Sequence, residues 1–309
     1  MPAFATEITE ENGQLIGPWR GPRQMLAEQT YDGHSSIHDD ETAQKLGFKG
    51  GTIEGPTHFS QFVPLCVARW GEEFLSKGCL SAHYRAPVFE GENVRAILEP
   101  TGDNAAICEI RMEREDGTEI LKGSASMGDP GAPTALEARL ETLRPLEDPV
   151  ILADVKIGMK SGRLPVRMDP DQHMGNYYPF SLSQKLTRIT EPSPLYEGEN
   201  GMIPFEMISV LAAYHQPEAN RFPTRGPAVG LYADQEIKLY GEPLRASTDY
   251  EIEREIVAMS GSRRTESMWV KTRIYAPGSD KVLAHMLLNT ASMKESYAKY
   301  EVEHKALYG

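Results

Sequence analysis

An aspartate, a histidine and a glycine within residues 31–56 have the types and order needed for proton transfer beside a polarised carbonyl. Asp32 and His38 lie in a polar turn, and a glycine-rich loop containing Gly55 leads to Pro56, where a helix is expected to begin. Imidazole takes and returns a proton near neutral pH, and a neighbouring carboxylate can share that work or fix the tautomer. Backbone N–H groups at a helix start can hold negative charge that develops on an oxygen. The same residue types are also common in ordinary turns and caps, which is the competing interpretation.

This stretch resembles the signature of the MaoC-like, (R)-specific enoyl-CoA hydratase and dehydratase family. The family signature runs Asp-x-Asn-Pro-[Ile/Leu]-His, followed by an acidic helix start, an alanine, and a glycine that opens the long helix of a hot-dog fold. Asp32, Ala43 and Gly55 stand at the family's separations. The resemblance implies that Asp32 and His38 form an acid–base pair and that the N–H of Gly55 stabilises an oxyanion.

The spacing of the histidine departs from the family signature. His38 follows Asp32 by six residues rather than five, and the Asn and Pro places hold His34 and Ser35. Either the turn bulges by one residue and His38 still reaches the pocket, or Ile37 takes the histidine's place and the pair is broken. The Ser-Ser sequence lacks the stiff proline, so the turn has freedom to absorb an extra residue.

Composition and charge exclude several classes of function. The formal charge of −13 argues against a nucleic-acid or anionic-membrane partner, because those surfaces are bound by clustered Lys and Arg. Cys66, Cys79 and Cys108 show no metal-ligand spacing and are expected to be reduced core residues. We find no secretory segment and no apolar run near the roughly 18 residues that cross a membrane, so we expect a cytoplasmic protein.

The first half of the chain predicts one long helix followed by antiparallel strands. A helix over 56–70 has an apolar face that includes Phe59, Phe62 and Trp70, with Pro64 expected to kink or tighten it. His58, at the helix start, could face a ligand, although a hydrogen-bonded histidine is the more usual arrangement there. Strands are expected at 80–85, 93–98, 110–112 and 119–127. This is an α+β pattern, which a curved sheet wrapped around the helix would satisfy.

The second half repeats the first. A second long helix is expected within 200–215. Four strands that correspond to those of the first half are expected within 233–240, 247–256, 266–276 and 282–293. The GSASM sequence that ends at Met127 is echoed by NTASM ending at Met293. A turn-rich segment with a helical piece, residues 128–149, separates the halves. We therefore expect a double hot-dog with units at 1–148 and 149–309, joined edge to edge.

The second half carries a degenerate copy of the signature. Glu191 stands in the aspartate place and Tyr196 in the histidine place, at the family's spacing of five. A phenol with a pKa near 10 is a poor base at neutral pH. The first half is therefore expected to be the active one.

The resemblance implies a hydro-lyase that adds or removes water across the α,β-bond of an acyl-CoA thioester, that is, an enoyl-CoA hydratase or acyl dehydratase. It implies no metal or redox cofactor. The partner is expected to be an acyl-CoA, with an acyl-carrier protein less favoured because the net charge opposes an acidic carrier. The alternatives are a non-catalytic acyl-CoA-binding or assembly subunit, and an acyl-CoA thioesterase that uses Glu54. A monomeric pseudo-dimer or a homodimer of such chains would satisfy the fold.

Overall fold

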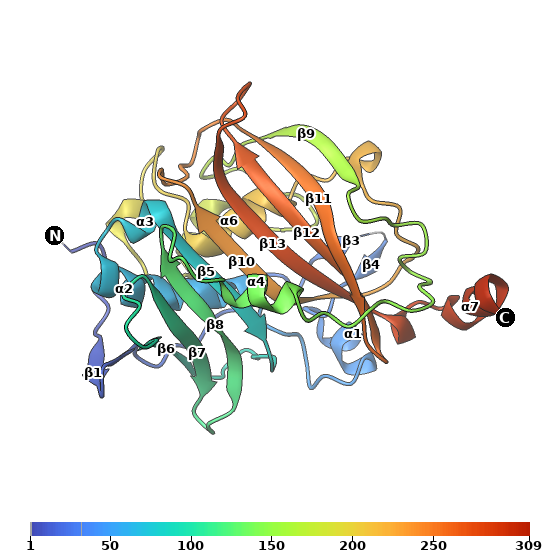
Figure 1. Cartoon of the computed structure of the whole chain (residues 1–309), viewed down its shortest axis with the longest axis horizontal. Helices are drawn as coiled ribbons and strands as arrows, with labels where there is room; N and C mark the ends of the chain where they lie inside the picture. The colour runs from blue at the N-terminus through green and yellow to red at the C-terminus, as the bar shows by residue number, and fades with distance from the viewer. Residues whose placement is uncertain (1, 32) are drawn as a thin grey trace.

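A computed structural model describes residues 2–31 and 33–309 of the chain (Figure 1). Asp32 lies outside the described residues. In the first half the elements are the strands and helices β1 (Thr9–Glu11), β2 (Gln14–Ile16), β3 (Thr30–Tyr31), β4 (His34–Ser35), α1 (Asp40–Lys45), η1 (Gly55–His58), α2 (Phe59–Trp70), α3 (Phe74–Lys77), β5 (Gly78–Tyr84), β6 (Val94–Pro100), β7 (Ile107–Arg114) and β8 (Glu119–Met127).

The second half has the same succession of one long helix and then four long strands. After α4 (Ala135–Leu140) its elements are β9 (Lys160–Val166), α5 (Leu182–Leu186), η2 (Pro194–Tyr196), α6 (Phe205–Ala213), η3 (Glu218–Asn220), β10 (Gly230–Leu239), β11 (Tyr250–Gly261), β12 (Thr265–Tyr275), β13 (Val282–Met293), η4 (Lys294–Ser296) and α7 (Tyr300–Tyr308). The predicted internal repeat is confirmed by this order of elements.

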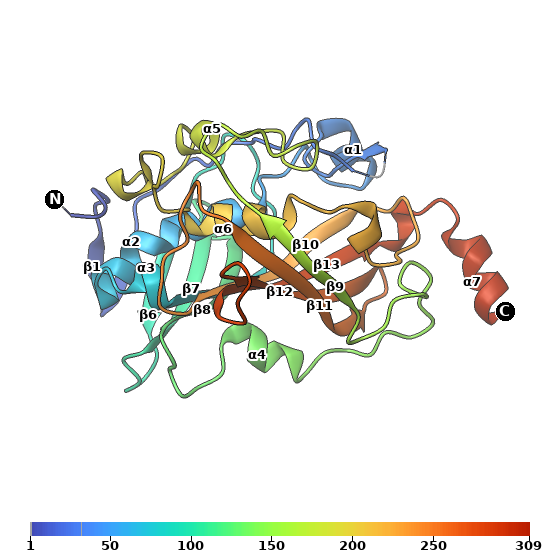
Figure 2. The same cartoon turned by 90° about the horizontal axis from the view of Figure 1, so that it is seen from above.

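The long helices form because their apolar residues can be buried on one face of a sheet. In α2, Phe59, Phe62 and Leu65 are fully buried, and the helix continues through Pro64. All nine residues of α6 are buried. Seen from above, α2 and α6 lie side by side on the same face of the sheet, and α4 lies against the opposite face (Figure 2).

The two halves share one sheet among the described residues. Its strand order is β1-β2-β6-β7-β8-β5-β10-β13-β12-β11-β9, and the halves meet where β5 pairs antiparallel with β10. Pairing removes the exposed edges that two separate sheets would present. The connecting segment closes this seam from outside, since the N–H of Leu136 in α4 donates to Oγ of Ser81 at 3.0 Å. Two helix-on-sheet units joined edge to edge are a double hot-dog, as predicted.

Some elements carry too little sequence signal to be predicted. Strand β2 extends the first half of the sheet by pairing with β6, and β9 extends the second half by pairing with β11. Strand β2 has only three residues, and β9 is a polar edge strand that contains Pro165, which edge positions tolerate. Cys66, Cys79 and Cys108 are free and buried, as expected. No helix in the described part of the chain combines the length and apolarity that a membrane span needs.

Candidate active site

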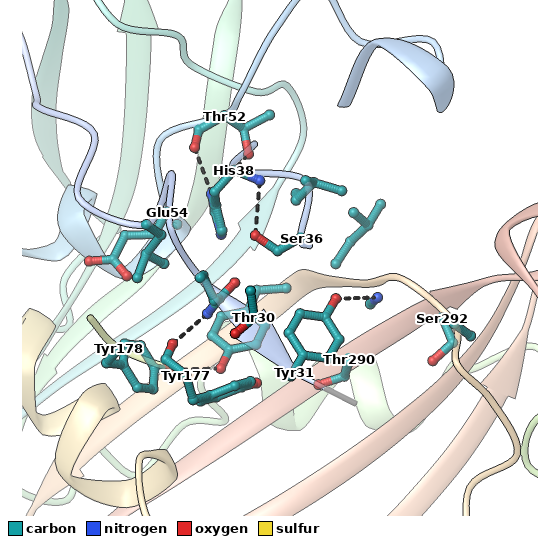
Figure 3. Close-up of a pocket in the computed structure, with 18 of the residues that line it drawn as sticks. Thr30, Tyr31, Ser36, His38, Thr52, Glu54, Tyr177, Tyr178, Thr290 and Ser292 are labelled. Carbon is teal, nitrogen blue, oxygen red and sulfur yellow. Dashed lines mark hydrogen bonds between the residues drawn. The ribbon is translucent and has the colours of Figure 1, made fainter. Parts of the chain in front are cut away.

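His38 lies in the wall of a large cavity and is held by its own local turn. Its backbone N–H donates to Oγ of Ser36 at 3.1 Å, and Asp39 directly after it caps α1 by accepting from the N–H of Thr42. The ring Nδ1 is 2.6 Å from the carbonyl oxygen of Thr52. Because a carbonyl can only accept, Nδ1 carries the proton and Nε2 keeps its lone pair. In Figure 3 the ring points away from Thr52 toward the side of the cavity where Thr30 lies.

Burial keeps this imidazole neutral. Removal from water lowers the pKa of His38, and this outweighs the opposing effects of its hydrogen bond to Thr52 and of the Glu54 charge. A neutral ring with a free lone pair can accept a proton from water near neutral pH. The carbonyl of Thr52 fixes which nitrogen does so.

The two halves can be aligned residue by residue at this turn. The N–H of Thr52 donates to the carbonyl of Ile37, and the N–H of Met202 donates to the carbonyl of Leu195. A Cβ on Gly51 would lie 2.2 Å from the carbonyl oxygen of His38, and one on Gly201 would lie 2.3 Å from that of Tyr196. Both contacts make Ile37 the counterpart of Leu195 and His38 the counterpart of Tyr196.

Two short paired strands precede Ile37 in the first half. Strands β3 and β4 pair antiparallel, with Tyr31 opposite His34, and Gly33 has a φ of +81° that favours glycine. This tight hairpin precedes the turn that positions His38. His38 and Ile37 both line the cavity, and their position relative to Asp32, which would decide between the two interpretations, lies outside the described residues.

Gly55 lies at the first position of η1, which runs directly into α2, and it too lines the cavity. At a helix start the backbone N–H groups have no acceptor within the helix. The ring of Tyr84 covers the Cα of Gly55, because a Cβ built there would lie 2.6 Å from Cζ of Tyr84. That ring is anchored by its hydroxyl, which donates to Oε1 of Gln235 at 2.9 Å.

Replacing Gly55 by alanine is expected to displace either the Tyr84 ring or the start of the helix. A shift of about 1 Å at a reacting centre costs about 100-fold in rate, so we expect a loss of 10- to 100-fold in kcat/KM, roughly, for any reaction at this site. Steady-state kinetics would measure it. Gly17→Ala is the matched control, because its Cβ would meet ordinary van der Waals contacts, the nearest at 3.5 Å. Equal activity of both variants would show that the site tolerates a side chain at position 55.

The cavity joins residues from both halves. Its volume is about 1320 Å³. The first half contributes His38, Gly55 and Tyr84, and the second half contributes Tyr178 before α5, Tyr232 in β10, and the loop residues 221–228. A space of this size fits a ligand much larger than a short acyl group alone.

A buried ion cluster joins the starts of the two long helices. Nζ of Lys185 in α5 lies 2.6 Å from Oε1 of Glu54 and 3.2 Å from Oε2 of Glu206, and all three side chains are buried. Burial alone would lower the pKa of Lys185, but the charges of Glu206 and Glu54 outweigh it and raise the pKa. Sequence reasoning singled out only Glu54, because its partners lie more than a hundred residues away.

The two carboxyl groups of this cluster have pKa values that are shifted in opposite directions. Burial would raise the pKa of Glu54, but the charge and hydrogen bond of Lys185 outweigh it and lower the pKa. Burial raises the pKa of Glu206, and the negative charge of Glu54 raises it further. The pKa values of the two carboxyl groups, which share one lysine, are therefore shifted in opposite directions.

His58 differs from its expected role. We expected the more usual hydrogen-bonded histidine at the helix start, and this is wrong: its Nδ1 is buried without a hydrogen-bond partner among the described residues. The side chain is 2 % exposed and lines the cavity. Burial, with a further contribution from the charge of Lys185, lowers the pKa of His58 to about 4.

The neutral state of His58 predicts a pH-dependent stability. The folded-state pKa of about 4 lies below the ordinary 6.5, so the unfolded chain binds the proton first and stability falls as the pH drops from 6.5 toward 4. Between pH 7 and pH 5, urea unfolding of the native protein should lose about 2 kcal/mol more than that of His58→Gln. Parallel losses in both proteins would contradict a neutral buried His58.

In the second half, the turn that corresponds to the His38 turn is covered by residues from the beginning of the first half. Phe4 packs edge-on against Tyr196, and Oγ of Ser193 donates to the carbonyl of Ala3 at 2.6 Å. Glu191 accepts from Nε of Arg20 at 2.7 Å and from Oγ1 of Thr6 at 2.5 Å. Residues 3–20 therefore cover the second signature.

Comparisons with known proteins give a likeness of structure. No protein-family model and no curated protein matches the sequence. Among solved structures, the chain is similar to MaoC-like dehydratases. A structure described as a MaoC-like dehydratase has a TM-score of 0.47 at 12% identity, over 94% of this chain and 98% of its own. A MaoC domain protein dehydratase from Chloroflexus aurantiacus has a TM-score of 0.49 at 15% identity, over 95% of each chain.

A structure described as an oleoyl thioesterase, from Lactobacillus plantarum, is also similar. Its TM-score is 0.41 at 9% identity, over 91% of this chain and 96% of its own. Likenesses at this level do not distinguish a dehydratase from a thioesterase. The residues of the cavity have to make that distinction.

Proposed function

We propose that the chain is a hydro-lyase that adds water to, or removes it from, the α,β-bond of an acyl-CoA thioester. The observation that carries the proposal is the neutral His38 ring, with Nδ1 bound to the Thr52 carbonyl, in the same cavity wall as the helix start at Gly55. Hydration requires a base for water next to a donor for the thioester oxygen, and both groups are present.

In the hydration direction, Nε2 of His38 takes a proton from water while the water oxygen bonds to the β-carbon. The electron pair of the double bond moves onto the thioester, whose oxygen becomes enolate-like. In this proposal the N–H of Gly55 donates to that oxygen, a contribution worth roughly 3 to 4 kcal/mol for one preorganised donor. A proton then returns to the α-carbon. In this proposal Asp32 shares the proton transfer with His38, as the family resemblance implies.

Glu54 is poorly suited to the thioesterase alternative. Its Oε1 is 2.6 Å from Nζ of Lys185 and accepts from Oγ1 of Thr57 at 3.1 Å. The lysine lowers the pKa of this carboxyl group, which makes it a weaker base and nucleophile. This favours hydration over hydrolysis.

The test is hydration of trans-2-enoyl-CoAs, followed by loss of enoyl absorbance and by mass spectrometry of the product. Gain of one water without release of free CoA would support the proposal. Release of free CoA would identify a thioesterase, and binding without any product would identify the non-catalytic subunit. CoA as carrier, a cytoplasmic location and the units 1–148 and 149–309 belong to the same proposal.

A further inference from the structure

His58 presents an unused polar group in the wall of the cavity. The side chain lines the cavity and is 2 % exposed, and its Nδ1 has no hydrogen-bond partner among the described residues. A buried polar atom without a partner destabilises a folded protein, so such atoms are rare. Neither the activation of water at His38 nor the N–H of Gly55 uses this ring. A ligand bound in the cavity would supply the missing hydrogen bond.

The backbone places the His58 ring close to the start of the helix. Residues Gly55–His58 form η1, a 3-10 helix, in which side chains three residues apart lie on the same face. Gly55 and His58 have this separation, and both line the cavity. Helical side chains also lean toward the N-terminus of their helix, so the ring leans back along the turn that begins at Gly55. Figure 3 shows Glu54, which directly precedes Gly55, beside His38 in the cavity wall.

The two histidines of the cavity differ in what they can offer a ligand. Nδ1 of His38 is bound to the carbonyl of Thr52, so Nε2 offers only a lone pair. No hydrogen bond among the described residues fixes the tautomer of His58, so its ring can present an N–H to an acceptor. Burial and the charge of Lys185 lower the pKa of His58 to about 4, which keeps the ring neutral near neutral pH. A neutral imidazole can polarise a carbonyl by donating a hydrogen bond while it keeps its proton.

We propose that the ring N–H of His58 donates a hydrogen bond to the thioester oxygen, together with the backbone N–H of Gly55. This rests on the proposed function and adds a catalytic residue to it. Negative charge grows on this oxygen as water adds to the β-carbon. A preorganised donor therefore stabilises the transition state more than the bound substrate. The ring gains its missing hydrogen bond when the thioester binds.

The test observes the carbonyl group of a bound thioester that cannot react. Butyryl-CoA, isotope-labelled at the thioester carbonyl carbon, has no double bond, so its infrared and carbon NMR spectra report hydrogen bonding independently of turnover. We expect the native protein to lower the carbonyl stretching frequency on binding. His58→Leu should remove about half of this shift, because one of two donors is lost. His38→Ala should leave the shift unchanged, because His38 acts on water.

Hydration kinetics and stability give the second readout. His58→Leu should lower kcat for enoyl-CoA hydration about 100- to 1,000-fold, the usual effect of removing one oxyanion donor, with a smaller change in KM. His58→Asn and His58→Gln keep an amide N–H near the places of Nδ1 and Nε2, so at least one of them should recover about 10-fold of the loss. In urea at pH 7, His58→Leu should be at least as stable as the native protein, since an apolar group replaces an unpaired polar one.

These results separate the inference from the proposed function. A carbonyl shift that depends on His58, in a protein that hydrates no enoyl-CoA, would keep the donor and remove the hydratase. Hydration by a protein whose carbonyl shift is the same with and without the His58 ring would keep the hydratase and remove the donor. A shift lost together with folding stability, without rescue by His58→Asn or His58→Gln, would assign the ring to the fold alone. Absence of butyryl-CoA binding would also overturn the inference.

Discussion

His38→Ala is expected to lower kcat/KM for enoyl-CoA hydration at least about 100-fold, because general acid–base groups contribute about 10²- to 10⁴-fold. The loss should be mainly in kcat, since the imidazole acts on water rather than on the bulk of the thioester. Hydration rates at substrate concentrations below and above KM would separate the two. Asp32→Asn tests its proposed partner in the same assay.

The stability of the His38→Ala protein and its binding of acyl-CoA distinguish a loss of catalysis from a loss of the folded site. His304→Ala, which removes an imidazole from α7, is the matched control and should leave hydration unchanged. If His38→Ala binds acyl-CoA as the native protein does but has lost turnover, the base is identified. If its hydration rate stays within about 3-fold of the native rate, His38 is not the base, whatever its position.

Lys185→Met is expected to lower the free energy of unfolding by about 3 to 5 kcal/mol, since breaking a buried ion pair leaves an uncompensated charge. The substitution leaves Glu54 and Glu206 without their common counter-ion. Both carboxyls must then be desolvated without a cation. Urea unfolding at pH 7 measures the change.

A surface ion pair is the control for this effect. Lys45→Met removes the pair between Lys45 and Glu41 in α1, whose side chains are 71% and 79% exposed. Such pairs contribute about 0 to 1 kcal/mol, so the change should be small. If adding Glu206→Gln to Lys185→Met restores no stability, the loss comes from packing of the lysine stem rather than from the unpaired charge.

The repeating helix and strands could be predicted because each carries its own periodic pattern. The apolar residues of α2 recur at helical spacing. The strands β5 to β8 and β10 to β13 are long enough to show alternation of apolar and polar residues. His38 and Gly55 could be chosen as candidates for a related reason, since the turn, the cap at Asp39 and the glycine loop lie within one stretch of chain. Asp32 is part of the same stretch but lies outside the described residues.

The rest of the cavity wall could not be predicted, because its partners are distant in the chain. Lys185 meets Glu54 across 131 residues, and Tyr178 meets Tyr232 across 54. No spacing rule links such residues, and a tyrosine or lysine at any of these positions looks like an ordinary surface residue in sequence. His58 could not be predicted for a different reason. A histidine at a helix start is usually hydrogen-bonded, but Nδ1 of His58 has no hydrogen-bond partner among the described residues.

The cover over the second signature constrains the order of folding. Thr6 and Arg20 bind Glu191 across 185 and 171 residues, whereas β7 pairs with β6 and β8, the strands next to it in sequence. Closing so long a loop costs more chain entropy than forming a hairpin. During synthesis residues 3–20 are made before Glu191, so the cover over the second signature cannot form until that part of the second half has been made, although β2 can already pair with β6.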